Sequence, residues 1–145
     1  MFKHFLLPTD GSALSDAAIR KGLQLAKSIN AKVTGIYVMP EFHVLAYGPE
    51  MLGDTQESYT KDCIAHSDQY RAMIVSAAKE SGVVCDTVSA TSDHPYEAII
   101  KAAEKIGCDL IVMASHGRRG IQGLLLGSET QKVLTHSKIP VLVFR

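Results

Sequence analysis

Short apolar runs alternate with longer amphipathic stretches throughout this 145-residue chain, and this alternation limits its fold more than any other feature. The apolar runs predict five β-strands, at residues 5–8, 32–38, 83–90, 110–114 and 140–144. Strands joined by helix-length connections run parallel, with right-handed crossovers. We therefore predict a single-domain α/β protein, a doubly wound parallel sheet with helices on both faces.

The stretches between the runs predict four helices, at residues 12–29, 57–81, 95–106 and 128–136. Pro95 suits a first helical turn, Asn30 suits a left-handed stop after the first helix, and Gly82 and Gly107 end the second and third. Apolar residues at helical spacing are the expected core positions: Leu14, Ala18, Gly22, Leu25 and Ile29 in the first helix, Ile64, Tyr70, Met73, Ile74 and Ala77 in the second, and Ile99, Ala102, Ala103 and Ile106 in the third.

Residue patterns also predict where individual segments lie. Residues Leu110–Ala114 are uniformly apolar, which is typical of a central strand buried on both faces. Polar and apolar residues alternate at 86–90, which indicates an edge strand. The one irregular insertion, residues 39–56, is predicted as a surface loop that is either mobile or placed over a ligand.

Charge and cysteine content exclude several functional classes. Lysine and arginine total 15, as do aspartate and glutamate, so no net charge attracts nucleic acid or an anionic membrane. Cys63, Cys85 and Cys108 form neither a C-x-x-C motif nor an even-numbered framework, which favours a reducing compartment. No apolar stretch reaches membrane-spanning length. We expect a soluble cytoplasmic protein whose partners include neither nucleic acid nor a membrane.

Two turns follow strands at the edge where open parallel sheets bind their ligands. The first is Pro8-Thr9-Asp10-Gly11-Ser12, which brings a carboxylate and two hydroxyls to this edge. Asp10 and Ser12 have two interpretations here, as ligand contacts or as caps of the helix that follows.

The second turn, residues 115–128, is rich in glycine. Residues 117–127 contain four glycines, the first and last residues included, together with Arg118 and Arg119. A helix is predicted to start at Ser128. Glycine backbone and a helix N-terminus favour phosphate, so we interpret this segment as a phosphate loop rather than a flexible connection. It matches neither the Walker pattern, which needs Lys before the final Ser, nor the G-x-G-x-x-G dinucleotide fingerprint.

This segment resembles the universal stress protein A family, whose nucleotide-binding members carry a glycine, two residues, a second glycine, nine residues, then Gly-Ser or Gly-Thr. Here Ala114 is followed by two residues, Gly117, nine residues, Gly127 and Ser128. The likeness covers nearly the whole chain, including residues 8–12, 33–38, 109–113 and 139–143. It implies a Rossmann-like sheet in the order 3-2-1-4-5 that binds ATP between the tips of strands one and four and dimerises through strand five.

The resemblance also assigns residues. Those implied to contact ATP, alone or with Mg or Mn, are Pro8, Thr9, Asp10, Val38, Met113, Ala114, His116, Gly117, Arg118, Gly127, Ser128 and Glu129. Those implied to form the homodimer interface are Val141, Leu142, Val143 and Phe144. The implied role is a regulatory stress-response module with at most slow hydrolysis.

Two positions depart from the family pattern. Ala114 stands where binding members have glycine, so its methyl group is expected to crowd the ribose. The Glu129 carboxylate is expected to repel a triphosphate unless a metal ion bridges the two or the carboxylate is turned away. Its other interpretation is an acid that suits the first helical turn.

Two other functions remain open at this point. One is a dimeric interaction module of the same family that binds no nucleotide. The other is an ATP-using adenylating or pyrophosphatase enzyme, although the Ser-Gly-Gly-x-Asp-Ser loop that would support it is absent and no nucleophile–base pair is evident. Cys63 and His66 lie three residues apart on one helix, but no second pair has ligand spacing, so we predict no metal site.

Overall fold

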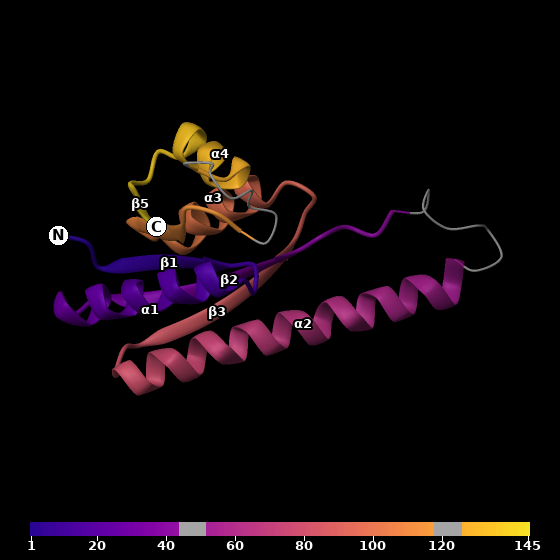
Figure 1. Ribbon diagram of the computed structural model, residues 1–145, viewed down its shortest axis with the longest axis horizontal. Coiled ribbons are helices and arrows are strands. Elements are labelled where there is room, and N and C mark those ends of the chain that lie inside the picture. Colours follow the sequence, from indigo (N-terminus) through magenta and orange to yellow (C-terminus); the bar gives the residue numbers. More distant parts are fainter. Residues whose placement is uncertain (44–51, 118–125) are drawn as a thin grey trace.

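Five parallel strands form one sheet in the order β3-β2-β1-β4-β5, as the resemblance implied (Figure 1). The computed structural model describes residues 1–43, 52–117 and 126–145, with backbone only at 52–55. The strands are β1 (His4–Thr9), β2 (Lys32–Met39), β3 (Cys85–Thr91), β4 (Leu110–Ala114) and β5 (Val141–Phe144). The helices are α1 (Ala13–Ser28), α2 (Leu52–Ser81), α3 (Pro95–Ile106) and α4 (Ser128–His136).

Each face of the sheet has its own apolar core. Helices α1 and α2 cover one face, and α3 and α4 cover the other (Figure 1). Successive side chains of a strand point to opposite faces, so Phe5 and Leu7 pack under α1 and α2 while Leu6 packs under α3 and α4. All five residues of β4 are buried, which confirms an interior strand, and β3 lies at an edge as predicted.

The helix ends follow the capping signals in the sequence. Ser12 is the N-cap of α1, where its side-chain oxygen accepts a hydrogen bond from the Ser15 N–H at 3.1 Å. Asn30 and Gly107 adopt positive φ angles of 58° and 77° after α1 and α3, and Pro95 lies in the first turn of α3. These local predictions are confirmed because each cap needs only neighbouring residues.

Other boundaries differ from the predictions. Strand β2 continues to Met39 and α2 begins at Leu52, so the expected loop at 39–56 is shorter at both ends. Strand β3 starts at Cys85 rather than at residue 83, because the Val83 N–H donates to the Ala78 carbonyl at 2.9 Å and closes the end of α2. The first residues of α2 have no apolar periodicity from which to predict a helix, because this end of the helix projects past the sheet (Figure 1).

Some expected core positions are exposed. Ile64 and Met73 on α2 are 49% and 48% exposed, and Ile29, which follows α1, is 43% exposed. The buried face of α1 includes Ile19 and Leu23 rather than Ile29. Other expected core positions are buried as predicted: Ala18, Gly22, Ile74, Ala77, Ile99 and Ala103. The amphipathic stripe therefore located the buried face of each helix but not where that burial ends. Among the described residues, no helix is both long and apolar enough to span a membrane.

A buried histidine fixes the start of the central strand. The His4 side chain is buried and shares a hydrogen bond with the Thr34 hydroxyl on β2, with 2.8 Å between Nε2 and Oγ1. Its backbone N–H donates to the Asp109 carboxylate at 3.0 Å. Burial, with a smaller contribution from Lys32, lowers the pKa of His4 from its ordinary value of 6.5.

We predict that His4 makes the fold sensitive to acid. Because its pKa is lowered in the folded chain, the unfolded chain binds the proton first as the pH falls below 6.5, and the free energy of unfolding decreases. Urea unfolding from pH 7 to pH 5 should show a smaller loss in His4→Gln than in the wild type. Lys32→Gln should give an intermediate loss, and equal losses in all three proteins would contradict the prediction.

Candidate functional site

The tips of β1 and β4 meet at the carboxyl edge of the sheet. Asp10, directly after β1, has one carboxylate oxygen against the Gly117 backbone, where a β-carbon would overlap Oδ2. Its other oxygen accepts a hydrogen bond from the Ser12 N–H at 2.9 Å. Asp10 thus shapes the turn before α1 and also closes against the residues that follow β4. The capping interpretation is confirmed for Ser12, and the role of Asp10 as a ligand contact stays a prediction.

Gly127 closes the far end of the glycine-rich segment onto its beginning. Its N–H donates to the Ser115 carbonyl at 2.6 Å. A β-carbon at Gly127 would lie 3.2 Å from that same oxygen and 3.3 Å from the His116 Cα. A side chain at Gly127 would require these backbone atoms to shift by a few tenths of an ångström, and the N-terminus of α4 is held beside His116 and Gly117.

His116 presents a nitrogen that has no protein partner in the described part of the chain. Its Nδ1 lies 2.9 Å from the Ser115 hydroxyl, while Nε2 is shielded from solvent without a hydrogen bond there. Ser115 is only 2% exposed, so its hydroxyl orients the imidazole and cannot reach a substrate as a nucleophile. A buried polar nitrogen of this kind normally has a partner, which makes it a ligand contact to test.

Strand β2 brings Val38 to the same edge. Tyr37 pairs with Thr9 in the parallel register, so Val38 lies at the level of Asp10 on the neighbouring strand. Val38 is half-buried and packs toward the α3 side of the sheet. Pro8 is buried within β1, and Thr9 bonds through its hydroxyl to the Gly11 N–H at 3.1 Å.

Met113 and Ala114 end the buried strand β4. Met113 is part of the α3 and α4 core, and Ala114 is 6% exposed. Among the described residues, the only non-glycine with positive φ is Asn30, so the backbone at Ala114 carries no left-handed strain. The Ala114 carbonyl accepts a hydrogen bond from the Thr130 hydroxyl at 2.9 Å, which anchors the first turn of α4 to the end of β4.

The Glu129 carboxylate is engaged by α3 and by its own helix. Oε2 accepts a hydrogen bond from the Tyr96 N–H at 3.0 Å, and Oε1 lies 3.1 Å from Lys132 Nζ. Tyr96 lies in the first turn of α3, whose N-cap residue His94 makes no capping hydrogen bond with its side chain. Glu129 thus lies in the first turn of its own helix, as its other interpretation has it, and in addition caps a neighbouring helix.

Sequence reasoning missed three residues that organise this region. Ser115 orients His116, Thr130 anchors α4, and the Tyr96 N–H holds Glu129. Hydroxyls beside a strand end and at a helix start are a weak signal for the first two. Nothing in the sequence indicates the third, because residues 96 and 129 meet only through packing of α3 on α4.

Other predicted features lie outside this region or outside the described residues. Arg118 and Arg119 are not among the described residues. Within the described ranges, no three His, Cys, Asp or Glu residues gather to hold a metal, Cys63 and His66 included. Burial raises the pKa of Cys108 to about 11 and raises that of Cys85, so neither thiol is a reactive thiolate at neutral pH.

Comparison with known proteins places this geometry in a family. Residues 1–145 match the model of the Universal stress protein family. The chain is 30% identical to Universal stress protein MJ0531 of Methanocaldococcus jannaschii, covering 100% of this chain and 83% of that protein. It is also 30% identical to Universal stress protein YxiE of Bacillus subtilis, covering 100% of each. This chain belongs to the universal stress protein family.

Solved structures agree with the fold. The structure of MJ0577, from a study assigning its biochemical function, superimposes with a TM-score of 0.80 at 27% identity, covering 99% of this chain and 95% of that one. Two universal stress proteins were solved with adenine nucleotides. One, in complex with cAMP, has a TM-score of 0.65 at 24% identity, covering 99% of this chain and 97% of that one. The other, from Archaeoglobus fulgidus in complex with dAMP, has a TM-score of 0.62 at 15% identity, covering 100% and 98%.

We predict that Glu129 stabilises the fold through α3. Glu129→Ala removes the acceptor for the Tyr96 N–H and should lower the free energy of unfolding by about 1 kcal/mol, the usual cost of losing a helix cap. Glu129→Gln keeps an acceptor and should lose less. Chemical denaturation measures both variants, with the exposed Glu104→Ala on α3 as the control. A Glu129→Ala protein no less stable than this control would show that the contact contributes nothing.

Proposed function

We propose that this protein binds an adenine nucleotide such as ATP, alone or with Mg or Mn, and acts as a cytoplasmic homodimeric regulatory module in a stress response. The observation that carries the proposal is His116 Nε2, a shielded nitrogen without a partner in the described residues, beside the start of α4. The cAMP and dAMP complexes of related folds support an adenine nucleotide as the ligand class.

The phosphates would lie on the segment that Gly127 closes. The first N–H groups of a helix have no carbonyl one turn earlier, and no side chain caps them at the Gly127 end of α4. His116 Nε2 can donate one hydrogen bond there in its Nε2–H tautomer. Donors and helix dipole at one place favour an anionic group, and Glu129 does not oppose it because its carboxylate is engaged by Tyr96 and Lys132.

The base and ribose would lie toward β1 and β2. Val38 lies beside the level of Asp10, so its backbone and the Asp10 turn border the same stretch of the sheet edge. Met113 and Ala114 end β4 next to them and would form the floor under the ribose. Pro8 and Thr9 would also contact the base and ribose, and Gly117 and Ser128 would contact the phosphates. In this proposal the base and the phosphates lie over different strands.

The nucleotide proposal predicts that a side chain added at Gly127 lowers ATP affinity. Gly127→Asp adds a charge and a β-carbon 3.2 Å from the Ser115 carbonyl, so ATP affinity should fall by at least about a hundredfold. Gly127→Ala tests the steric part alone and should fall less. Isothermal titration calorimetry measures the ATP affinity of both variants. Gln24→Asp, at an exposed position of α1, is the control for the added charge. Absence of ATP binding by wild type, or equal affinity in Gly127→Asp, would contradict the proposal.

Strand β5 is the proposed dimer contact. Val141, Leu142, Val143 and Phe144 are only half-buried, and β5 pairs with β4 alone among the described strands. The Pro140 and Phe144 carbonyls accept hydrogen bonds from Ile111 and Ser115. Alternate residues of a parallel strand bond to the same neighbour, so the backbone groups of Val141 and Val143 face the open edge. Antiparallel pairing with a second copy about a two-fold axis would use those groups and close the assembly at two.

The dimer proposal predicts that the Val143 N–H, which faces the open edge of β5, contributes to dimerisation. Val143→Pro removes the outward N–H without removing a bond to β4, and Leu142→Asp adds charge to the same edge, so both should shift the protein toward the monomer. Light scattering at micromolar concentration reports the mass, and Val84→Asp, at a side chain 72% exposed beside the opposite edge, is the control. A monomeric wild type, or two variants that remain fully dimeric, would exclude this interface.

A further inference from the structure

The chain leaving β2 is fastened to the loop after β3 by a single carboxylate, that of Asp93. Asp93 Oδ1 accepts a hydrogen bond from the Glu41 N–H at 3.0 Å. Asp93 Oδ2 lies 2.5 Å from His43 Nε2. Two groups on residues 40–43, which we name the exit segment, therefore converge on one side chain from a loop more than fifty residues away in sequence.

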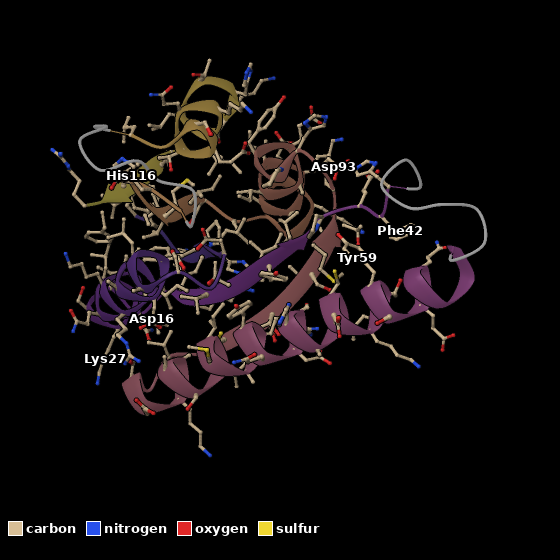
Figure 2. All side chains as sticks on the ribbon, turned by 45° about the vertical axis from the view of Figure 1, so that its right-hand side comes forward. Asp16, Lys27, Phe42, Tyr59, Asp93 and His116 are labelled. Carbon is tan, nitrogen blue, oxygen red and sulfur yellow. The ribbon has the colours of Figure 1, made fainter. Side chains whose placement is uncertain are left out.

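The same exit segment is also held from the other side by α2. The rings of Phe42 and Tyr59 lie 5.3 Å apart between centroids, at an interplanar angle of 57°. The Tyr59 hydroxyl lies 3.4 Å from the carbonyl oxygens of Pro40 and Glu41. Figure 2 shows Phe42, Tyr59 and Asp93 grouped at one end of the molecule, with His116 well apart from them.

The exit segment follows directly from the strand end that borders the Asp10 turn. Val38 and Met39 pair with Ala90 and Thr91, and the Ser92 N–H donates to the Met39 carbonyl at 2.8 Å. The sheet ladder fixes the path only to Met39. Beyond that residue, Asp93 and Tyr59 contact the described part of the chain and help to set its direction.

We infer that Asp93 is a positioning residue for the base-binding half of the nucleotide site: its carboxylate holds the exit segment directly after Val38 and Met39, the strand end where we propose that the base lies. This inference rests on the proposed nucleotide binding and adds a residue to it. The phosphate half depends on β4 and α4, two strands away across the sheet, so Asp93 affects the two halves unequally.

The test compares a ligand that has a base with one that has only phosphates. ATP and inorganic tripolyphosphate are titrated into wild type, Asp93→Ala, Asp93→Asn and His43→Ala, with Asp68→Ala as the control. Asp68 is an exposed carboxylate on α2 that pairs with Arg71 and makes no contact with the exit segment in the described residues. Losing a charged acceptor for two groups should weaken ATP binding about tenfold in Asp93→Ala.

Tripolyphosphate affinity should change less than about twofold in the same protein, since its contacts are on the other half of the site. Asp93→Asn retains an acceptor for the Glu41 N–H and should be intermediate. His43→Ala removes one exposed ring and covers the case in which Asp93→Ala does not fold; it should also lower ATP affinity selectively.

The outcomes separate the inference from the function on which it rests. Unchanged ATP affinity in the Asp93 and His43 variants, or equal losses for ATP and tripolyphosphate, would overturn the role of Asp93 while leaving nucleotide binding intact. A wild type that binds neither ligand would overturn both. If wild type binds ATP but not tripolyphosphate, an ATP loss in Asp93→Ala and not in Asp68→Ala supports the inference, and no such loss overturns it.

Discussion

The side-by-side burial of β1 and β4 is the constraint on which the rest of this structure depends. Both strands are covered by helices on two faces, so their backbone groups must be satisfied by neighbouring strands, and their buried side chains are apolar or, like His4, hydrogen-bonded. Parallel strands bring their carboxyl ends to one edge. The turns after β1 and β4 therefore meet, and Asp10 contacts Gly117 although they are more than a hundred residues apart in sequence.

The start of α4 connects the end of β4 to the glycine-rich segment and to α3. Thr130 bonds to the end of β4, Gly127 closes the glycine-rich segment, and Glu129 caps α3. The three residues lie within four consecutive positions at the start of α4. Glu129, which the sequence analysis expected to repel a triphosphate, is therefore a structural link between two helices.

Much of the fold could be predicted because it depends on local chemistry. The positions of the five strands, the Ser12 cap and the left-handed Asn30 follow from residue periodicity and backbone sterics over a few neighbours. The start of α2 and the exposure of Ile64 and Met73 could not be predicted, because a helical stripe does not reveal where the sheet beneath it ends. The strand order itself came from the family resemblance, since apolar periodicity is the same for any order.

By itself the sequence determined the class of the sheet, the glycine-rich turn and the carboxylate turn that lie at its edge, and the residues that belong to the family pattern. Only the tertiary structure decided how those residues face one another. It turned Glu129 toward Tyr96, left His116 Nε2 without a partner among the described residues, and joined Asp93 to the exit segment. The physical reason is that capping and periodicity act within one turn or one strand, whereas a hydrogen bond between distant segments depends on the packing of whole helices and strands.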